Sequence, residues 1–523
     1  MARHETLAAV DLGSNSLHLF IGRVVGGQIY PLDSLREAVR LGAGLTADKR
    51  IDRATQARAL ETLGKFGERL RGFPRQAVRA VGTNALRVAK NAPQFLRDAR
   101  AALGFPIEVI AGREEARLIY LGVAHTLPKA DHRRLVVDVG GGSTEFIIGT
   151  GLETQLTESL YMGCVSYSLK YFPDGEIDKP RMKAAELAAR QELAAVVPAC
   201  RALGWQESIG SSGTVQAIES ILIENGYVAQ GITREGLDRL RSLAIKQGRA
   251  DPERIPGLRS SRAAVFAGGL AILVAVFDEL GIERMAISES ALRHGVLYDL
   301  LGRVEHRDMR GTTVAQFMRR YHVDAAQAER VRQLSLRVYD ALLADQSVDR
   351  AAEDDPDRQL LDWAACLAEV GLSIAHAQYH KHSAYVLSNA DMPGFSRMEQ
   401  QRLARVVLAH RGKLGKMEDP GLEDDDWRLV FALRLASLIL RNRTDAPLPP
   451  LRVTADTAGY TLELPREWLE ENPLTEAALE AESGSWKAVG MKFAVTRVTE
   501  RRAAQIAKLE VVPARAVIPA SRE

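Results

Sequence analysis

Two short segments place an acid beside a glycine turn, a combination that is suited to binding phosphate. In each segment an apolar run predicts a buried strand and leads to an aspartate, and glycine and serine follow. The segments are Asp11-Leu12-Gly13-Ser14-Asn15-Ser16 and Asp138-Val139-Gly140-Gly141-Gly142-Ser143-Thr144-Glu145. Glycine lets the backbone turn tightly against a ligand, and successive N–H groups in such a turn bind anions. An acid beside an anion site suggests a divalent cation that bridges carboxylate and phosphate. The glycine triplet alone also fits a plain hairpin. The strand–aspartate–glycine pattern, however, occurs twice, which favours a duplicated fold with two facing phosphate loops.

Further charged residues fall near the starts of predicted helices. Residues 77–81 predict a strand that leads into a helix, and Arg87 in its first turns has a guanidinium fork that suits phosphate. A solvated helix arginine is the alternative. Glu114 and Glu115 begin a later helix and point about 100° apart. We therefore expect Glu115 to face the cleft and Glu114 to pair outward with Arg117 or Arg113. The alternative for both glutamates is an ordinary acidic first turn, which the helix dipole favours.

The elements that must position these residues follow a repeated order. Strand-strand-strand-helix-strand-helix occurs twice before residue 305, which predicts two α/β lobes with a ligand cleft between them. In the first lobe we expect strands at residues 18–25, 28–35, 77–81 and 107–110, and a helix at 52–70 with Asp52 as its N-cap. In the second lobe, residues 210–214 form another turn with glycine and hydroxyls at a helix start, and this turn contains Gly213.

Beyond residue 310 the apolar periodicity is helical only. We expect helices at residues 325–343, 359–375, 397–409 and 427–440, and a small α/β module after the proline-rich residues 445–450. His376, His380, His382 and His410 accompany these helices and allow a basic patch facing a polyanion, a metal site, or ordinary core and surface histidines. The expected domains are 1–120, 121–305, 306–445 and 446–523.

Composition excludes several classes of protein. The net charge of +2 over 523 residues gives no generally basic surface, so nucleic-acid binding is not expected. Three widely spaced cysteines provide neither a disulfide framework nor a zinc site. The N-terminus lacks the apolar region of a signal peptide. The longest mostly apolar run, residues 265–277, is shorter than the ~18 residues of a membrane span. We expect a buried helix there, a cytoplasmic protein, and no stable membrane insertion.

The motifs, in their order, resemble the exopolyphosphatase / guanosine pentaphosphate phosphohydrolase family of the actin / sugar kinase / Hsp70 superfamily. Besides the two glycine turns, the resemblance rests on Gly82-Thr83 with Arg87, Gly112-Arg113-Glu114-Glu115-Ala116-Arg117-Leu118-Ile119 and Met162-Gly163-Cys164-Val165. It implies an α/β fold of duplicated actin-like (ribonuclease H-like) lobes, followed by an all-helical HD-like domain and a small α/β C-terminal domain.

The resemblance also implies an activity and assigns roles to residues. The activity is hydrolysis of the terminal phosphoanhydride of inorganic polyphosphate by a homodimer with Mg²⁺ and often K⁺, and guanosine pentaphosphate is the alternative substrate. Glu115 matches the catalytic general base, and Asp11, Asp138 and Glu145 match acids that hold the metal. Phosphate contacts are expected from Ser14, Asn15, Arg87, Gly140, Gly141, Gly142, Ser143 and Gly213.

Two departures from the family pattern alter these expectations. HD-type sites carry a histidine before the acid of the third domain, but Ala368 precedes Glu369 here, so a second metal centre is not expected there. Leu160 and Tyr161 stand where arginines are common, so the lining of the channel is expected to differ.

Two other classes of function remain open. A kinase of the same superfamily would need an adenine pocket, which residues 210–214 could form, but only kinship of fold supports it. A non-catalytic sensor of alarmone or polyphosphate would not need to gather mutually repelling carboxylates around a polyanion.

Overall fold

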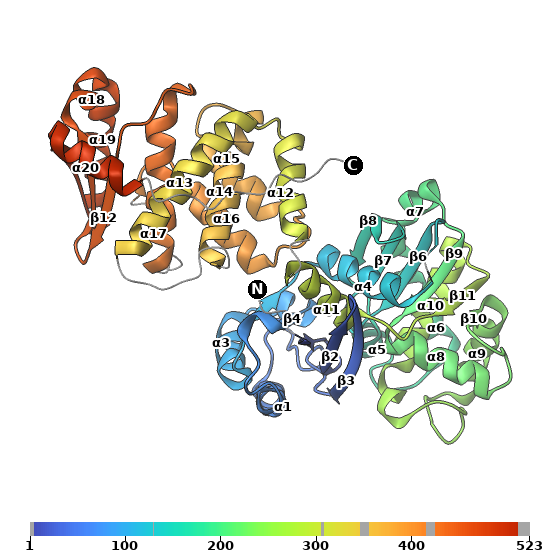
Figure 1. Ribbon diagram of the computed structural model, residues 1–523. Helices are drawn as coiled ribbons and strands as arrows, with labels where there is room; N and C mark the ends of the chain where they lie inside the picture. The colour runs from blue at the N-terminus through green and yellow to red at the C-terminus, as the bar shows by residue number, and fades with distance from the viewer. Residues whose placement is uncertain (1–4, 129, 305–307, 346–354, 415–423, 511–523) are drawn as a thin grey trace. The chain divides into compact units, whose positions relative to one another are not determined.

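A computed structural model describes residues 5–128, 130–304, 308–345, 355–414 and 424–510 of the chain (Figure 1). The chain forms two compact units. The first contains Met1–Arg310 and Asp391–Met398, and the second contains Gly311–Ala390 and Glu399–Glu523. Residues 511–523 of the expected C-terminal domain lie outside the described residues.

The first unit begins with a five-stranded sheet in the order β3-β2-β1-β4-β5. Its strands are β1 (Thr6–Leu12), β2 (Leu17–Val25), β3 (Gln28–Glu37), β4 (Val78–Gly82) and β5 (Ile107–Val109). The first three form an antiparallel meander, and β4 and β5 run parallel to β1. The expected helix is α1 (Arg53–Arg69), and the Asp52 side chain accepts from the Thr55 N–H at its start, which confirms the predicted N-cap.

A second sheet in the same unit repeats this plan, with the order β10-β11-β9-β6-β7-β8. Its strands are β6 (Arg134–Val139), β7 (Thr144–Thr150), β8 (Glu153–Leu160), β9 (Glu207–Ser211), β10 (Ile232–Thr233) and β11 (Arg284–Ile287). Again a meander of three strands is joined to parallel strands, because β9 runs parallel to β6 and β11 to β9. The predicted duplication of the α/β fold is therefore confirmed.

Side-chain alternation turns both aspartates of the glycine turns toward one face. In β1, Ala8, Val10 and Leu12 pack with α1 and with α3 (Ala92–Leu103), while Leu7 and Ala9 belong to a core shared by the two lobes. Asp11 has the parity of Leu7 and Ala9. In β6, Val136 belongs to the same shared core, and Asp138 has its parity. Because successive residues of a strand point to opposite faces, both carboxylates project between the lobes.

Two helices join the lobes by exchanging partners. Helix α4 (Gly112–Thr126) follows the first sheet but packs on β7 and β8 of the second. Helix α11 (Leu292–Val304) follows the second sheet but packs on β1 and β4 of the first, and it also packs against α4. A buried ion network ties them together, since Asp299 of α11 accepts from Arg117 of α4 and from Arg79 of β4. This exchange holds the two glycine turns in one rigid setting.

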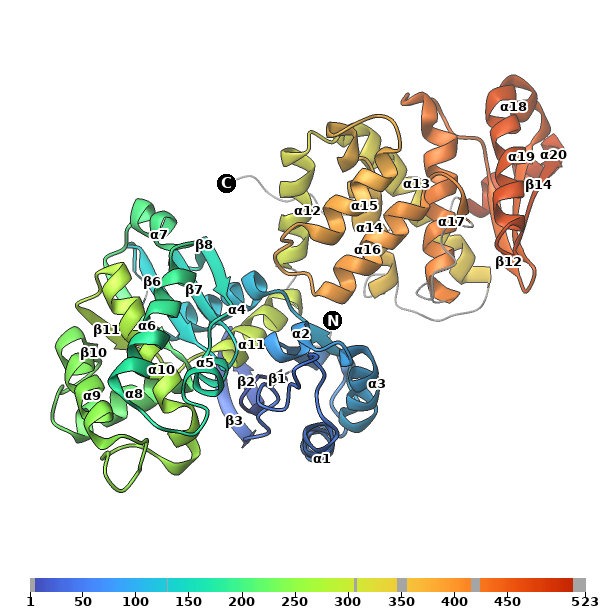
Figure 2. The same ribbon diagram turned by 180° about the vertical axis from the view of Figure 1, so that it is seen from behind.

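The expected buried helix is α10 (Ser260–Leu280), and the structure confirms its burial. It packs against α5 (Cys164–Tyr171), α6 (Lys179–Leu193), α8 (Ser212–Glu224) and α9 (Arg234–Gln247) in the second lobe (Figure 2). Among the described residues it is the one helix whose length and composition would allow a membrane span, and 78% of its most apolar window is buried. Such a helix is typical of a protein core, so it gives little support for insertion into a membrane.

The second unit consists of helices followed by a small sheet. Its helices include α13 (Ala325–Asp345), α14 (Pro356–Leu367), α15 (Tyr379–Asn389), α16 (Arg397–Ala409) and α17 (Asp424–Ile439). The sheet is formed by β12 (Arg452–Asp456), β13 (Gly459–Pro465) and β14 (Lys492–Val498), and α19 (Pro473–Lys487) packs against it. Helix α17 also contacts α19, and Phe431 stacks on Tyr460 of β13. The helical and sheet parts thus share a core.

One helix prediction in this unit is wrong. The periodicity predicted one helix over residues 359–375, but α14 ends at Leu367 and a separate 3₁₀ turn covers Val370–Ser373. The buried Ser383 hydroxyl donates to the Ala368 carbonyl and accepts from the Gly371 N–H. A Cβ on Gly371 would lie 2.2 Å from the Tyr379 carbonyl oxygen. Helix α15 therefore approaches the break closely, and its serine satisfies the backbone groups that a continuous helix would have paired.

Candidate active site

The two glycine turns lie in direct contact. The turn after β1 and the turn after β6 face each other closely enough that a Cβ on Gly141 would lie 3.0 Å from the Cβ of Ser14. A Cβ on Gly142 would lie 2.6 Å from Oδ1 of Asn84, the first residue of α2 (Asn84–Val88). Since these contacts leave no room for a side chain, the glycines are required by the approach of the two lobes. The turns that the sequence predicted as facing loops are brought together.

The hydrogen bonds of the turns leave several main-chain donors for a ligand. The Gly140 N–H donates to the Ser143 carbonyl and closes the turn, while the Gly140 and Gly141 carbonyls accept from the first amides of α5. In the part of the chain that the structure describes, the N–H groups of Asn15, Gly141 and Gly142 donate to no protein acceptor. Exposed amides in adjoining turns form an anion-binding surface.

A cavity of about 320 Å³ opens at these turns. Most of the sequence-predicted site residues line it: Asp11, Ser14, Asn15, Glu115, Asp138, Gly140, Gly141, Gly142, Ser143 and Gly213. Arg87 and Glu145 do not line the cavity. Their side chains lie behind Glu115 and Asp138, and their effect on a ligand would act through those residues.

The acids of the site are buried and crowded. Burial, with repulsion from Glu115, raises the pKa of Asp11 to about 7. Burial also raises the pKa of Asp138 to about 7, against a hydrogen bond from Ser211. The pKa of Glu145 lies well above its ordinary value because of burial and the charges of Glu115 and Asp138. The shifts come first from burial, and the mutual repulsion of neighbouring carboxylates adds to them.

Arg87 is paired with the predicted general base. Its Nη1 donates to Oε2 of Glu115 at 2.7 Å and to the Ile110 carbonyl at 3.1 Å. Both side chains are nearly buried, with 6% and 10% of their surface exposed. The arginine predicted to bind phosphate therefore holds Glu115 in one orientation. This geometry suits a residue that positions the base.

Glu114 pairs with Arg117, one of its two expected partners, but the pair is buried and does not face outward. Its carboxylate is buried and accepts two bonds of 2.8 Å from Arg117, one turn further along α4. It also accepts from the main-chain N–H of Gly394 at 2.9 Å. The expected outward orientation is wrong because α4 packs against α11, β7 and β8, and the Gly394 N–H also covers the Glu114 carboxylate.

The residues fit a divalent cation. Oδ1 of Asp11 and Oε2 of Glu145 are buried and have no hydrogen-bond partner. Among the described residues, no group of three or more histidine, cysteine, aspartate and glutamate side chains is arranged to hold a metal ion. Mg²⁺ commonly binds through one or two carboxylates and completes its shell with water and substrate phosphates. Asp11 and Asp138, which line the cavity, are the carboxylates in place to hold it.

Sequence reasoning missed the cations that face these acids. Arg36, Arg262 and Arg293 line the cavity, and none of them forms a salt bridge within the described part of the chain. Burial lowers the pKa of Arg293, which lies near Asp11 and Asp138. The internal duplication could have revealed Arg293. Helix α11 follows β11 in the second lobe just as α4 follows β5 in the first. Arg293 thus occupies the helix start that corresponds to the one bearing Glu115.

Ser212 carries strained backbone at the edge of the cavity. It has φ of +91°, a conformation that residues other than glycine rarely adopt, and its hydroxyl accepts from the Thr214 and Val215 N–H groups. A Cβ on the adjoining Gly213 would lie 2.0 Å from Nη2 of Arg262. Gly213 therefore provides the space in which the Arg262 guanidinium reaches the cavity.

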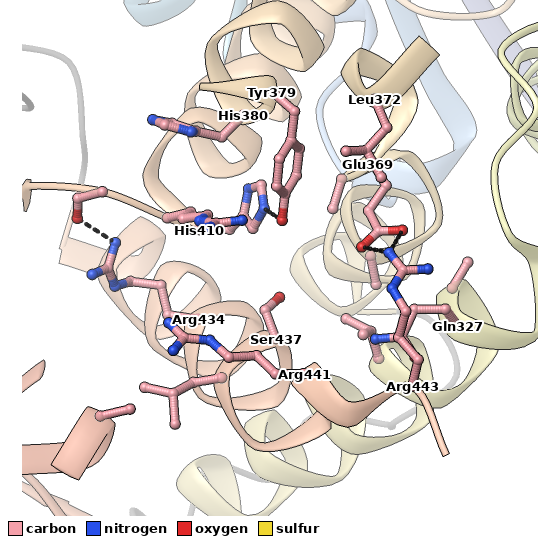
Figure 3. Close-up of a pocket in the computed structure, with 18 of the residues that line it drawn as sticks. Gln327, Glu369, Leu372, Tyr379, His380, His410, Arg434, Ser437, Arg441 and Arg443 are labelled. Atoms are coloured by element: carbon pink, nitrogen blue, oxygen red, sulfur yellow. Dashed lines mark hydrogen bonds and ion pairs between the residues drawn. The ribbon is translucent and has the colours of Figure 1, made fainter. Parts of the chain in front are cut away.

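The histidines of the second unit gather around a separate cavity of about 740 Å³ (Figure 3). His376, His380 and His410 line it, and His382 does not. Glu369, at the position of the acid in HD-type sites, accepts from Arg443 through both oxygens at 2.5 and 2.6 Å. A guanidinium therefore engages this carboxylate, and no metal cluster is found here among the described residues.

Comparisons with known proteins agree with the fold. A model of the Ppx/GppA phosphatase family matches residues 20–304, and a model of Ppx/GppA phosphatase domain III matches residues 309–483. The chain is 38% identical over 479 residues to a protein of Aeromonas hydrophila named guanosine-5'-triphosphate,3'-diphosphate pyrophosphatase, covering 91% of this chain and 95% of that protein.

Solved structures match the first part of the chain. An exopolyphosphatase from Cytophaga hutchinsonii is similar with a TM-score of 0.51 and 26% identity, covering 57% of this chain and 97% of that protein. An exopolyphosphatase-like protein matches with a TM-score of 0.53 and 24% identity, covering 57% of this chain and 98% of that protein. The second of these likenesses concerns the fold alone.

Proposed function

The chain belongs to the Ppx/GppA phosphatase family, and we propose that it hydrolyses the terminal phosphoanhydride bond of guanosine pentaphosphate or of inorganic polyphosphate. The observation that carries this proposal is the cavity in which two glycine turns, with unpaired N–H groups, meet buried carboxylates. The relative that matches 91% of the chain is named for the guanosine nucleotide, so this substrate is favoured over the polyphosphate expected from the sequence.

The glycine turns would hold the terminal phosphoryl group. Donors for its oxygens are the N–H groups of Asn15, Gly141 and Gly142, with the Ser143 hydroxyl at the same turn. Arg293 and Arg262 add positive charge on the opposite wall. Phosphoryl transfer depends mainly on positioning and on stabilising the charge of the transition state. Fixed donors in a narrow cavity serve both needs, since they need no reorganisation during the reaction.

Glu115 would accept the proton of the attacking water. It lines the cavity, while its neighbour Arg87 holds one carboxylate oxygen and leaves the other for the water. Mg²⁺ held by Asp11 and Asp138 would neutralise the negative charge that develops on the phosphate oxygens. The buried acids would otherwise repel a polyanionic substrate, so the metal and the three arginines complete the charge balance of the site.

The test is phosphate release from each substrate at matched concentration, with Mg²⁺ or with EDTA. Glu115→Gln should lower kcat by about a hundredfold or more, the usual contribution of a general base, and should leave substrate binding intact. The matched control is Glu153→Gln, an exposed glutamate on β8. Full turnover by the Glu115 variant, or no phosphate release from either substrate by the unaltered chain, would refute the proposal.

A further inference from the structure

The cavity of the second unit is a second binding site with a chemistry of its own. Its volume of about 740 Å³ lies within the range of small-molecule sites. Helices α13 and α14 form one wall, and α15, α17 and the 3₁₀ turn Leu440–Asn442 complete it with α19. All of its lining residues belong to the second unit, so the site is distinct from the cavity at the glycine turns.

One wall of the cavity is apolar and made of small side chains. Ala328 and Val331 of α13, Ala365 of α14 and Ala368 beside it are buried and line the cavity, and Leu372 continues the surface. Alanines leave a flat face between the helices that larger residues would fill. Such a wall accepts a planar or apolar group, because burial of apolar surface is favourable.

The other wall is cationic. Arg434 of α17 and Arg441 of the following 3₁₀ turn lie across from Tyr379 and His380 (Figure 3). Arg411 also lines the cavity, and its guanidinium lies 5.1 Å from the centre of the Tyr379 ring. Arginine on the face of an aromatic ring is held by a cation–π interaction.

The two acids that line the cavity, Glu482 and Glu369, are each paired with an arginine that also lines it. Glu482 of α19 accepts two bonds from Arg434 at 2.6 and 2.7 Å, and Glu369 binds Arg443. Arg411 and Arg441 form no salt bridge among the described residues. Burial lowers the pKa of His410 to about 4, so this ring adds no charge near neutral pH. The guanidinium charges of Arg411 and Arg441 are therefore balanced by no acid among the described lining residues.

We propose that this cavity binds a phosphomonoester that carries a planar group, such as a nucleoside monophosphate. Two unbalanced cations match the charge of a phosphomonoester dianion, and the alanine wall matches a flat ring. An inorganic polyphosphate segment fits less well, since it has no apolar part and carries more negative charge than Arg411 and Arg441 balance. The proposal does not depend on the reaction at the glycine turns.

Photolabelling of the full chain tests the location of the site. The probe is 8-azido-AMP, with peptide mapping by mass spectrometry after irradiation. We expect label on peptides that contain residues 365–380 or 434–443, and we expect AMP and GMP to prevent it. Label confined to peptides that contain the glycine turns, at residues 11–16 and 138–145, would overturn the proposal.

Calorimetry with AMP, GMP and inorganic tripolyphosphate tests the chemistry. The double variant Arg411→Ala/Arg441→Ala should weaken AMP or GMP binding by about tenfold or more, as loss of hydrogen bonds to a charged group predicts. Both arginines are exposed, so the variant should fold, and Lys381→Ala on the same unit, whose side chain is also exposed and does not line the cavity, is the control. Equal affinity of the double variant, or tighter binding of tripolyphosphate than of AMP and GMP, would overturn the proposal. Because neither experiment measures hydrolysis, its outcome is separate from that of the proposed function.

Discussion

The two cavities contain the same kinds of charged residue in opposite arrangements. At the glycine turns, the buried oxygens of Asp11 and Glu145 lack hydrogen-bond partners, and the arginines of that cavity form no salt bridge among the described residues. In the second unit, Glu369 and Glu482 each hold an arginine through two oxygens. Behind the first cavity Arg87 pairs with Glu115, but Asp11 and Asp138 form no salt bridge among the described residues, whereas the second cavity pairs both of its acids internally.

The difference explains why only one cavity suits a metal-dependent reaction. Unpaired buried carboxylates have raised pKa values and gain stability when a cation arrives. Carboxylates that already bind a guanidinium gain nothing from a metal and leave only surplus arginines to attract an anion. The comparison makes opposite predictions for the removal of an acid from each cavity.

Removal of Glu482 should give the largest effect on stability. Glu482→Ala leaves Arg434, whose side chain is 6% exposed, with only the Ala409 and Gly412 carbonyls. Breaking a buried pair should lower the free energy of unfolding by about 3–5 kcal/mol. Urea unfolding can be followed by the fluorescence of the fully buried Trp486 on the same helix.

The control for this variant is Glu480→Ala. Glu480 is 66% exposed and meets Arg497 at 3.7 Å, so its loss should cost less than about 1 kcal/mol. If both variants lost the same free energy of unfolding, the Glu482–Arg434 pair would not be buried in solution.

At each cavity an arginine pairs with a glutamate: Arg87 with Glu115 and Arg443 with Glu369. Removal of the arginine should lower catalytic activity in the first case only. Arg87→Ala frees Glu115 from its fixed orientation and should lower kcat by about a hundredfold or more. Arg443→Ala frees Glu369 and should leave kcat unchanged, since no step of the proposed reaction involves it. Steady-state phosphate release measures both.

The same assay also distinguishes two roles for Arg87. If Arg87 positions Glu115, kcat falls while KM changes little, because the carboxylate is no longer held in one orientation. A rise in KM at unchanged kcat would instead assign it to substrate binding, the role expected from the sequence.

Removal of Asp11 should stabilise the protein, in contrast to Glu482. Because the pKa of Asp11 is about 7 in the folded state and 3.8 ordinarily, the folded protein retains a proton that the unfolded chain has lost between these values. The free energy of unfolding therefore falls as pH rises through this window. Asp11→Asn removes this loss, so its Tm should exceed that of the unaltered chain by a few degrees at pH 8 and by less at pH 5.

The comparison for this variant is Asp238→Asn on the exposed surface of α9. Thermal unfolding without added metal, at both pH values, gives the difference. An Asp11 variant that is less stable than the unaltered chain at pH 8 would show that another group in the site already compensates the carboxylate.

Local features of the chain were predictable where short-range chemistry decides them. The Asp52 cap and the apolar run at residues 265–277 are set by neighbours in the sequence. The break after Leu367 was not predictable from periodicity, since the hydroxyl that satisfies it comes from Ser383 on another helix. The outward orientation of Glu114 was wrong for a similar reason, because its cover comes from α11 and Gly394.

The sequence by itself determined the duplicated strand–acid–glycine pattern, the acids that share a cavity, and the helix that bears Glu115. These follow from residue type, spacing and strand alternation, which act over a few residues. Only the tertiary structure decided that Arg87 serves Glu115, that Arg293 faces the two aspartates, and that Arg443 engages Glu369. Ion pairs form between residues that are close in space but far apart in the sequence, so the order of residues does not reveal them. Burial then sets how strongly each pair interacts.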